Sequence, residues 1–79
     1  MNRQPIKKYI RLENDHMLVF PSDIEHRHVA EQQPWRTISA GFLDPEYMVC
    51  FGESMSLGIG GLPDDTEILR RTGQEQAVA

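Results

Sequence analysis

The segment Trp35–Ser56 constrains the fold most, because it predicts two β-strands around a tight turn. Asp44 and Pro45 fit the first two positions of a type I turn. Pro45 disfavours the two-residue hairpin turns, so we expect a longer connection with a bulge. A three-residue loop would place Leu43 opposite Tyr47, whereas a slip by one residue would exchange the faces. Either register leaves large apolar side chains on both sides of the hairpin.

The rest of the chain predicts an α+β fold with a small antiparallel β-sheet and two short helices. Ser22, followed three residues later by Glu25, is typical of a helix N-terminus, and Asp64 is a second such cap. The expected order is β-β-α-β-β-β-α, with both helices on one face of the sheet. The expected elements are strands at 5–12, 17–20, 35–43, 47–51 and 55–59 and helices at 23–32 and 65–72.

The length of 79 residues predicts a single domain, 1–79, with flexible ends at 1–4 and 74–79. A domain of this size buries a limited core and is marginal without additional support. Cys50 is the only cysteine, so no intrachain disulfide can supply that support. A partner subunit is the simplest remaining source of burial.

The hairpin therefore predicts a homodimer. In the three-residue-loop register Tyr47, Val49 and Phe51 share one face, and two short helices can cover only the other. A contiguous apolar patch usually marks an interface, packed here either sheet to sheet or strand edge to strand edge. The alternative is that the N-terminal strand and a long loop fold over this face.

Charge is distributed unevenly along the chain. The net charge is −4, yet the first twelve residues contain four bases and no acid. Arg3, Lys7, Tyr9 and Arg11 would form a basic-aromatic strand face able to contact nucleic acid. The overall negative charge counts against this interpretation, and a solvated strand face is the simpler alternative.

No complete catalytic or metal-binding pattern is present. Gly52-Glu53-Ser54-Met55-Ser56 has serine where a nucleophile elbow requires its second glycine. The side chains of His26 and His28 diverge on a helix and cannot share one metal, and Cys50 lies in an apolar strand. We expect an exposed His26, a partly buried His28 next to Ile24 and a buried Cys50. The sequence predicts no enzyme activity, no metal and no cofactor.

No apolar run is long enough to span a bilayer, and no apolar segment follows the basic N-terminus as in a secretion signal. We therefore expect a cytoplasmic protein with no membrane partner.

Two stretches, LVFPSDIEHRHVA at 18–30 and ISAGFLDPEYMVCFGESMSLG at 38–58, resemble small uncharacterised bacterial proteins of plasmids and integrated conjugative elements. The resemblance implies a bacterial accessory protein and carries no activity. The leading hypothesis is a non-enzymatic homodimeric interaction module, with a protein partner that the sequence does not identify. The alternatives are a small DNA-associated regulator using the N-terminal strand, and an enzyme with a composite site at a dimer interface using His28 or Glu53.

Overall fold

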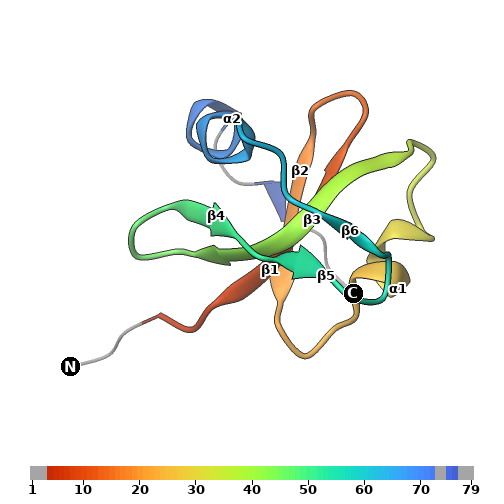
Figure 1. Cartoon of the computed structure of the whole chain (residues 1–79), viewed down its shortest axis with the longest axis horizontal. Coiled ribbons are helices and arrows are strands. Elements are labelled where there is room, and N and C mark those ends of the chain that lie inside the picture. Colours follow the sequence, from red (N-terminus) through yellow and green to blue (C-terminus); the bar gives the residue numbers. More distant parts are fainter. Residues whose placement is uncertain (1–3, 73–74, 77–79) are drawn as a thin grey trace.

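The computed structural model describes residues 4–72 and 75–76 and confirms the predicted α+β class (Figure 1). Two residues of the tail that was expected to be flexible form the last strand, while Arg3 lies outside the described residues. The elements are β1 (Lys7–Leu12), β2 (Met17–Pro21), α1 (His26–Ala30), β3 (Thr37–Asp44), β4 (Val49–Phe51), β5 (Glu53–Ser54), β6 (Ile59–Gly60), α2 (Asp65–Thr72) and β7 (Glu75–Gln76).

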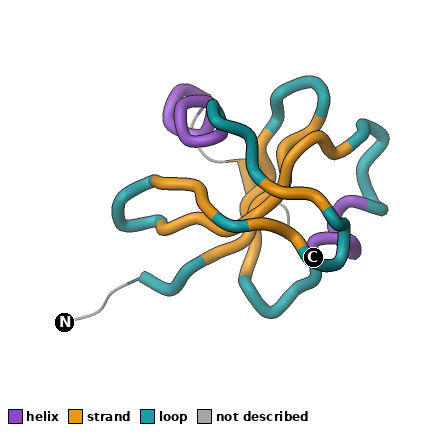
Figure 2. Tube along the Cα trace, viewed as in Figure 1, coloured by secondary structure: helices purple, strands orange, loops and turns teal. Residues whose placement is uncertain are grey.

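The main sheet has the strand order β4-β3-β1-β2-β7, and β5 and β6 form a separate two-stranded ladder (Figure 2). β1 is central and pairs antiparallel with both β2 and β3, whereas β7 pairs parallel with β2. A central strand is covered on both faces in a compact fold, and Tyr9 and Ile10, which point to opposite faces, are both fully buried.

The two helices cover opposite faces of the sheet, which corrects the expectation that both lie on one face. Ile68 and Leu69 of α2 pack in one core cluster with Tyr9. Val29 of α1 packs in the other cluster with Ile10. In Figure 1, α2 and α1 accordingly lie far apart, above the β3–β4 hairpin and at the opposite end of β3. The sheet therefore needs no second copy to cover its centre.

The β3–β4 hairpin adopts neither the three-residue loop nor the face assignment expected from it. Leu43 pairs with Cys50 and Asp44 with Val49, so four residues, 45–48, connect the strands. The Met48 N–H donates to the Asp44 carbonyl oxygen at 2.7 Å, and Met48 has a positive φ of 55°. This turn puts Val49 and Phe51 on the same face as Phe42 and leaves Tyr47 in the loop.

The first helix begins later than predicted. It starts at His26, and Glu25 occupies the N-cap position without a side-chain hydrogen bond. Ser22 lies instead in a turn in which the Ile24 N–H donates to the Pro21 carbonyl oxygen. The second helix has the predicted bounds, with acids in its first turn and arginines in its last. The expected strand at 55–59 is mostly a turn between β5 and β6.

Three segments of the chain approach one another closely at glycine residues, where a larger side chain would meet neighbouring atoms. A Cβ on Gly41 would lie 2.6 Å from the Phe51 carbonyl oxygen and 3.2 Å from the Gly52 carbonyl oxygen. A Cβ on Gly61 would lie 2.9 Å from the Tyr9 hydroxyl oxygen. We call this place, at Gly41, Gly52 and Gly61, the glycine crossing. It lets the chain after β4 pass close to β3, with the segment leading to α2 running beside it.

Candidate interaction surface

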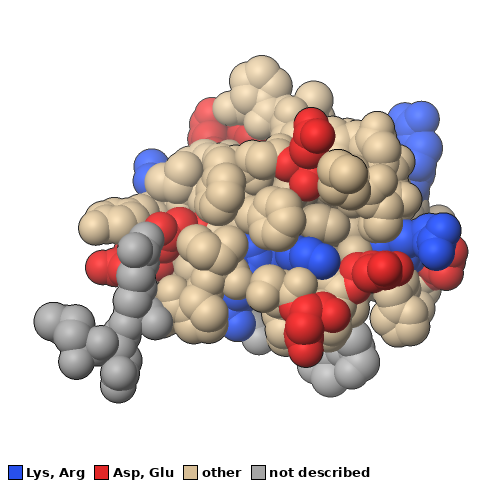
Figure 3. Space-filling view, turned by 60° about the horizontal axis from the view of Figure 1, so that its bottom comes forward, with Lys and Arg blue, Asp and Glu red and all other residues tan. Residues whose placement is uncertain are grey.

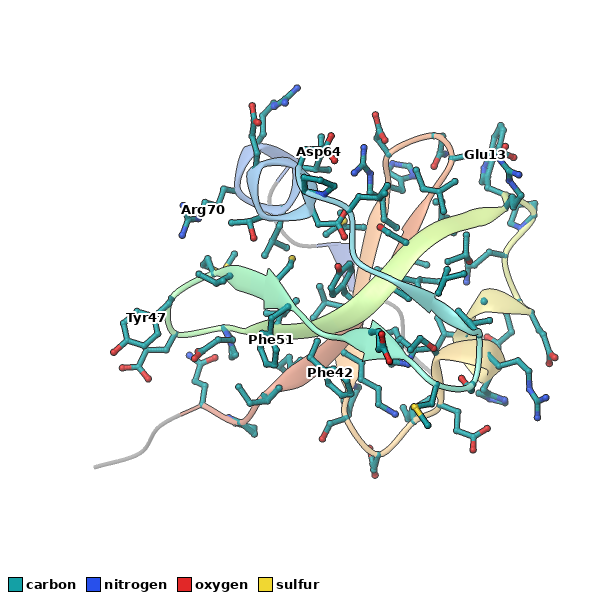
Figure 4. The ribbon with its side chains drawn as sticks, in the orientation of Figure 1. Glu13, Phe42, Tyr47, Phe51, Asp64 and Arg70 are labelled. Carbon is teal, nitrogen blue, oxygen red and sulfur yellow. The ribbon has the colours of Figure 1, made fainter. Side chains whose placement is uncertain are left out.

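The outer face of the β3–β4 hairpin carries exposed apolar side chains. Phe42 and Phe51 are directly paired across the strands, and their rings stack with centroids 6.1 Å apart. Val49, two residues before Phe51, lies on the same side. Phe51 is 47% exposed and Val49 38% exposed, while Phe42 is partly buried. We call Phe42, Val49 and Phe51 the hairpin face (Figure 4).

Tyr47 belongs to the same end of the molecule but not to the hairpin face. It lies in the 45–48 loop, is 63% exposed, and points away from the body of the molecule in Figure 4. Of the three residues predicted for an interface, the structure therefore places Val49 and Phe51 on one surface and Tyr47 at its outer end.

The opposite side of β4 packs inward. Met48 and Cys50 contact the core cluster beneath α2. Burial, followed by the charge of Asp65, raises the pKa of the Cys50 thiol to about 11. The thiol is therefore protonated at neutral pH and is a poor nucleophile, and its side chain is partly buried where the sequence predicted a buried one.

The free edge of β4 is covered by side chains of α2. The Cys50 N–H donates to the Thr66 hydroxyl at 2.9 Å. Arg70 donates from Nε to the Met48 carbonyl oxygen at 3.0 Å and from Nη2 to the Tyr47 carbonyl oxygen at 3.1 Å. The one outward β4 N–H for which a bond is seen, that of Cys50, and two carbonyl groups of the adjoining loop are thus already hydrogen-bonded, which disfavours addition of a strand here.

A depression of about 180 Å³ adjoins the hairpin face. Phe42 forms one wall, and Met55, which is 88% exposed, lies at its rim. Lys8, the cross-strand neighbour of Phe42, also lines the depression, and its ammonium donates to the Ile24 carbonyl oxygen at 2.9 Å. The remaining lining residues are Glu25, His26, Glu53 and Ser56.

The structure contradicts the expected basic face of the N-terminal strand. Tyr9 is fully buried and Arg11 is 6% exposed, because α2 packs over this side of β1. The Arg11 guanidinium binds three carboxylates, at 2.9 Å from Asp15, 2.7 Å from Asp64 and 2.9 Å from Asp65. Hydrogen bonding to Asp64 is the main factor that raises the pKa of Arg11. Neither residue can reach a phosphate without unfolding this contact.

Asp65 is the centre of a buried polar network that the sequence did not reveal. Its carboxylate accepts hydrogen bonds from the Tyr9 hydroxyl, Arg11 Nη1, the Ser39 hydroxyl and the Leu62 N–H. With 1% exposure and four donors, this carboxylate is satisfied without a ligand. Burial, followed by the hydrogen bond to Asp65, raises the pKa of Tyr9. The network fixes the start of α2 on the sheet.

The histidine assignments are reversed relative to the sequence prediction. His26 is 3% exposed, and its Nε2 lies 2.7 Å from the Gly41 carbonyl oxygen, so this nitrogen is the protonated donor. Its ring meets Phe20 and Phe42 edge-on at 5.7 and 5.6 Å. His28 is exposed and lies 3.2 Å from the Gln32 amide. Helical periodicity failed here because α1 starts at His26 instead of residue 23.

Ser54, the serine of the incomplete elbow motif, has a structural contact. Its side chain is buried and accepts the Leu57 N–H at 3.1 Å, which closes the turn between β5 and β6. Among the described residues, no group of three or more histidine, cysteine, aspartate or glutamate side chains could hold a metal ion.

Acidic and basic side chains alternate on the face in Figure 3, with no continuous basic patch. No helix within the described part of the chain is long and apolar enough to cross a bilayer.

Comparison with protein-family models, with curated proteins and with solved structures gave no match to this chain. The resemblance to proteins of plasmids and conjugative elements therefore stays an expectation, and no relative supplies a function.

Proposed function

We propose that this chain is a non-enzymatic interaction module that forms a homodimer through the end of the β3–β4 hairpin. The observation that carries the proposal is the exposure of Tyr47, Val49 and Phe51 at 63%, 38% and 47% within one short hairpin. Single exposed apolar residues are ordinary, but several adjacent ones on a small domain usually mark a contact surface.

The hairpin is the proposed interface because the helices cover both faces at the centre of the sheet. α1 and α2 each seal one core cluster, and the hairpin extends beyond both. Among the strand residues of the main sheet whose burial is described, Val49 and Phe51 are thus the large hydrophobic side chains that the helices leave exposed. A second copy offers the same surface, and closed twofold dimers are the commonest assembly of small proteins.

The polar side chains support a binding role over catalysis. Asp65 has four donors, Ser54 closes a turn, and His26 is bound to a backbone carbonyl. Catalytic groups generally lie within reach of substrate with a free lone pair or proton. These three residues are instead committed to contacts within the fold.

Light scattering across micromolar concentrations tests the proposal. The wild-type chain should reach the mass of a dimer, and Phe51→Glu should remain monomeric because the charge would be buried in the interface. Trp35→Glu is the matched control: Trp35 is 49% exposed, like Phe51 at 47%, but precedes β3 at the end away from the hairpin loop. The control should dimerise normally.

A wild-type chain that stays monomeric throughout this range would contradict the proposal. Loss of the dimer in Trp35→Glu with retention in Phe51→Glu would place the interface elsewhere. Circular dichroism of each variant establishes that the fold is intact before masses are compared.

Most of the described residues that were predicted to contact nucleic acid in the DNA-associated alternative are not accessible. Tyr9 and Arg11 are buried, and of the predicted set only Lys7 is partly exposed within the described residues. No observation favours it as a second function.

A further inference from the structure

We infer that the second copy packs against the hairpin face, with Phe42, Val49 and Phe51 at its centre, and does not add a strand to the β4 edge. The inference rests on the proposed homodimer and specifies how the two copies meet. It assigns the depression beside Phe42 to the same interface.

The first argument is the occupied edge. Antiparallel addition of a strand needs free N–H and C=O groups along β4. The Cys50 N–H of β4 is already bound to Thr66, and in the loop next to the strand Arg70 binds the carbonyl oxygens of Met48 and Tyr47. Edge pairing would have to break these bonds and move α2, whose first turn is fixed by the Asp65 network.

The second argument is the shape of the apolar surface. The stacked rings of Phe42 and Phe51 are continuous with the wall of the 180 Å³ depression. Interface energy concentrates where an apolar anchor fills a pocket that water leaves. Met55, almost fully exposed at the rim, is a flexible apolar side chain of the kind that enters such a pocket in an opposing copy.

The third argument is charge, and it favours a second copy over an acidic or basic partner. Lys8 lies beside Phe42 on this face, and Glu25 and Glu53 line the same depression. A partner of one charge sign would meet a like charge on one side. In a twofold arrangement Lys8 of each copy can face the carboxylates of the other, so the surface complements itself.

Thr66→Ala separates the two geometries. The substitution removes both the hydroxyl that accepts the Cys50 N–H and the methyl group beside it, so that this N–H becomes accessible to an opposing strand. With face packing, the dimer dissociation constant should stay within about twofold of wild type. With edge pairing, the released N–H would bind the opposing strand and tighten the dimer about tenfold.

Glu53→Lys tests the charge argument. It places two ammonium groups at the depression, so two opposing copies would repel, and the dimer should weaken about tenfold. Glu31→Lys is the matched control, because the Glu31 side chain is 68% exposed at the end of α1 and lies outside the depression. The control should change the dissociation constant by less than about twofold.

Nuclear magnetic resonance on serial dilution gives a readout that does not depend on variants. Face packing predicts that the side-chain signals of Phe42, Val49 and Phe51 shift with dilution and that no intermolecular nuclear Overhauser effect joins the Cys50 amide to the backbone of the opposing copy. Such an effect at the Cys50 amide, or a tighter Thr66→Ala dimer, would overturn the inference and leave the homodimer standing. A wild-type chain that is monomeric at every concentration would instead remove the proposed function itself.

Discussion

His26 shows how one buried side chain links the interior to the hairpin face. Its ring contacts Phe42, which stacks on Phe51, and its Nε2 donates to the Gly41 carbonyl oxygen. Burial lowers the pKa of His26 below its ordinary value of 6.5, and the charge of Lys8 acts in the same direction. The neutral ring is therefore the form that the fold accepts.

The stability of the fold should consequently depend on pH through His26. Because its pKa is lower in the folded than in the unfolded chain, the unfolded chain binds more protons near pH 6. The stabilisation is complete above pH 6.5 and is lost as pH falls towards the lower, folded-state pKa. Urea unfolding from pH 7.5 down to 5 should show this loss in wild type.

His26→Gln, which keeps a donor for Gly41, should reduce that pH dependence. His28→Gln, a change at an exposed histidine, should retain the full wild-type slope. Equal slopes in wild type and His26→Gln would show that His26 does not titrate differently in the two states.

At the scale of elements, the glycine crossing determines where β4 and β5 can run. A methyl group on Gly41 would overlap the backbone oxygen of Phe51 at 2.6 Å, and backbone cannot rotate away as a side chain can. We expect Gly41→Ala to lower the free energy of unfolding by about 3 kcal/mol or more, measured by denaturant titration.

Gly58→Ala is the comparison for this prediction. Gly58 has a φ of 70°, but a methyl group there meets nothing within 4 Å. Only the cost of a left-handed backbone applies, about 1 kcal/mol. A loss of only about 1 kcal/mol in Gly41→Ala would contradict the prediction, because it would show that the neighbouring backbone gives way to the added methyl group at little cost.

The elements that were predicted correctly are those whose sequence signals lie within the element itself. The α2 bounds follow from acids in the first turn and arginines in the last, all within eight residues. The register of the β3–β4 hairpin does not follow from local signals. Met48 closes the loop with a positive φ, and Arg70 of α2 binds two carbonyl groups of the loop. A contact across 22 residues leaves no pattern in the loop itself.

The same difference between local signals and long-range contacts explains which parts of the candidate interaction surface could be predicted. The exposure of Val49 and Phe51 agrees with the prediction, but the prediction placed them on the face opposite to Phe42 and assumed that both helices cover one face, and both of these expectations were wrong. The burial of Arg11 was not predictable, because two of its carboxylates lie 53 and 54 residues away. Alternation along β1 identified its two faces correctly, but it could not show that α2 would cover the charged one.

At the scale of the whole molecule, 79 residues are divided between two core clusters on opposite sides of one sheet. Each cluster is small, so the folded monomer has a limited reserve of stability. Association through the hairpin face would add burial that neither core supplies.

The thermal midpoint of the wild-type chain should therefore rise with protein concentration, because dimerisation stabilises only the folded state. Differential scanning calorimetry at several concentrations measures this directly. Phe51→Glu should show a midpoint independent of concentration, while Trp35→Glu should follow wild type. A constant wild-type midpoint would argue against dimerisation in the folded state.

The glycine crossing also separates the parts of the chain that can vary from those that cannot. It uses the backbone of residues 51 and 52 and leaves the side chains at 49 and 51 pointing outward. Substitutions at these outward positions can accumulate without disturbing how the strands thread past one another. The path of the backbone at the glycine crossing is thus independent of which side chains occupy positions 49 and 51.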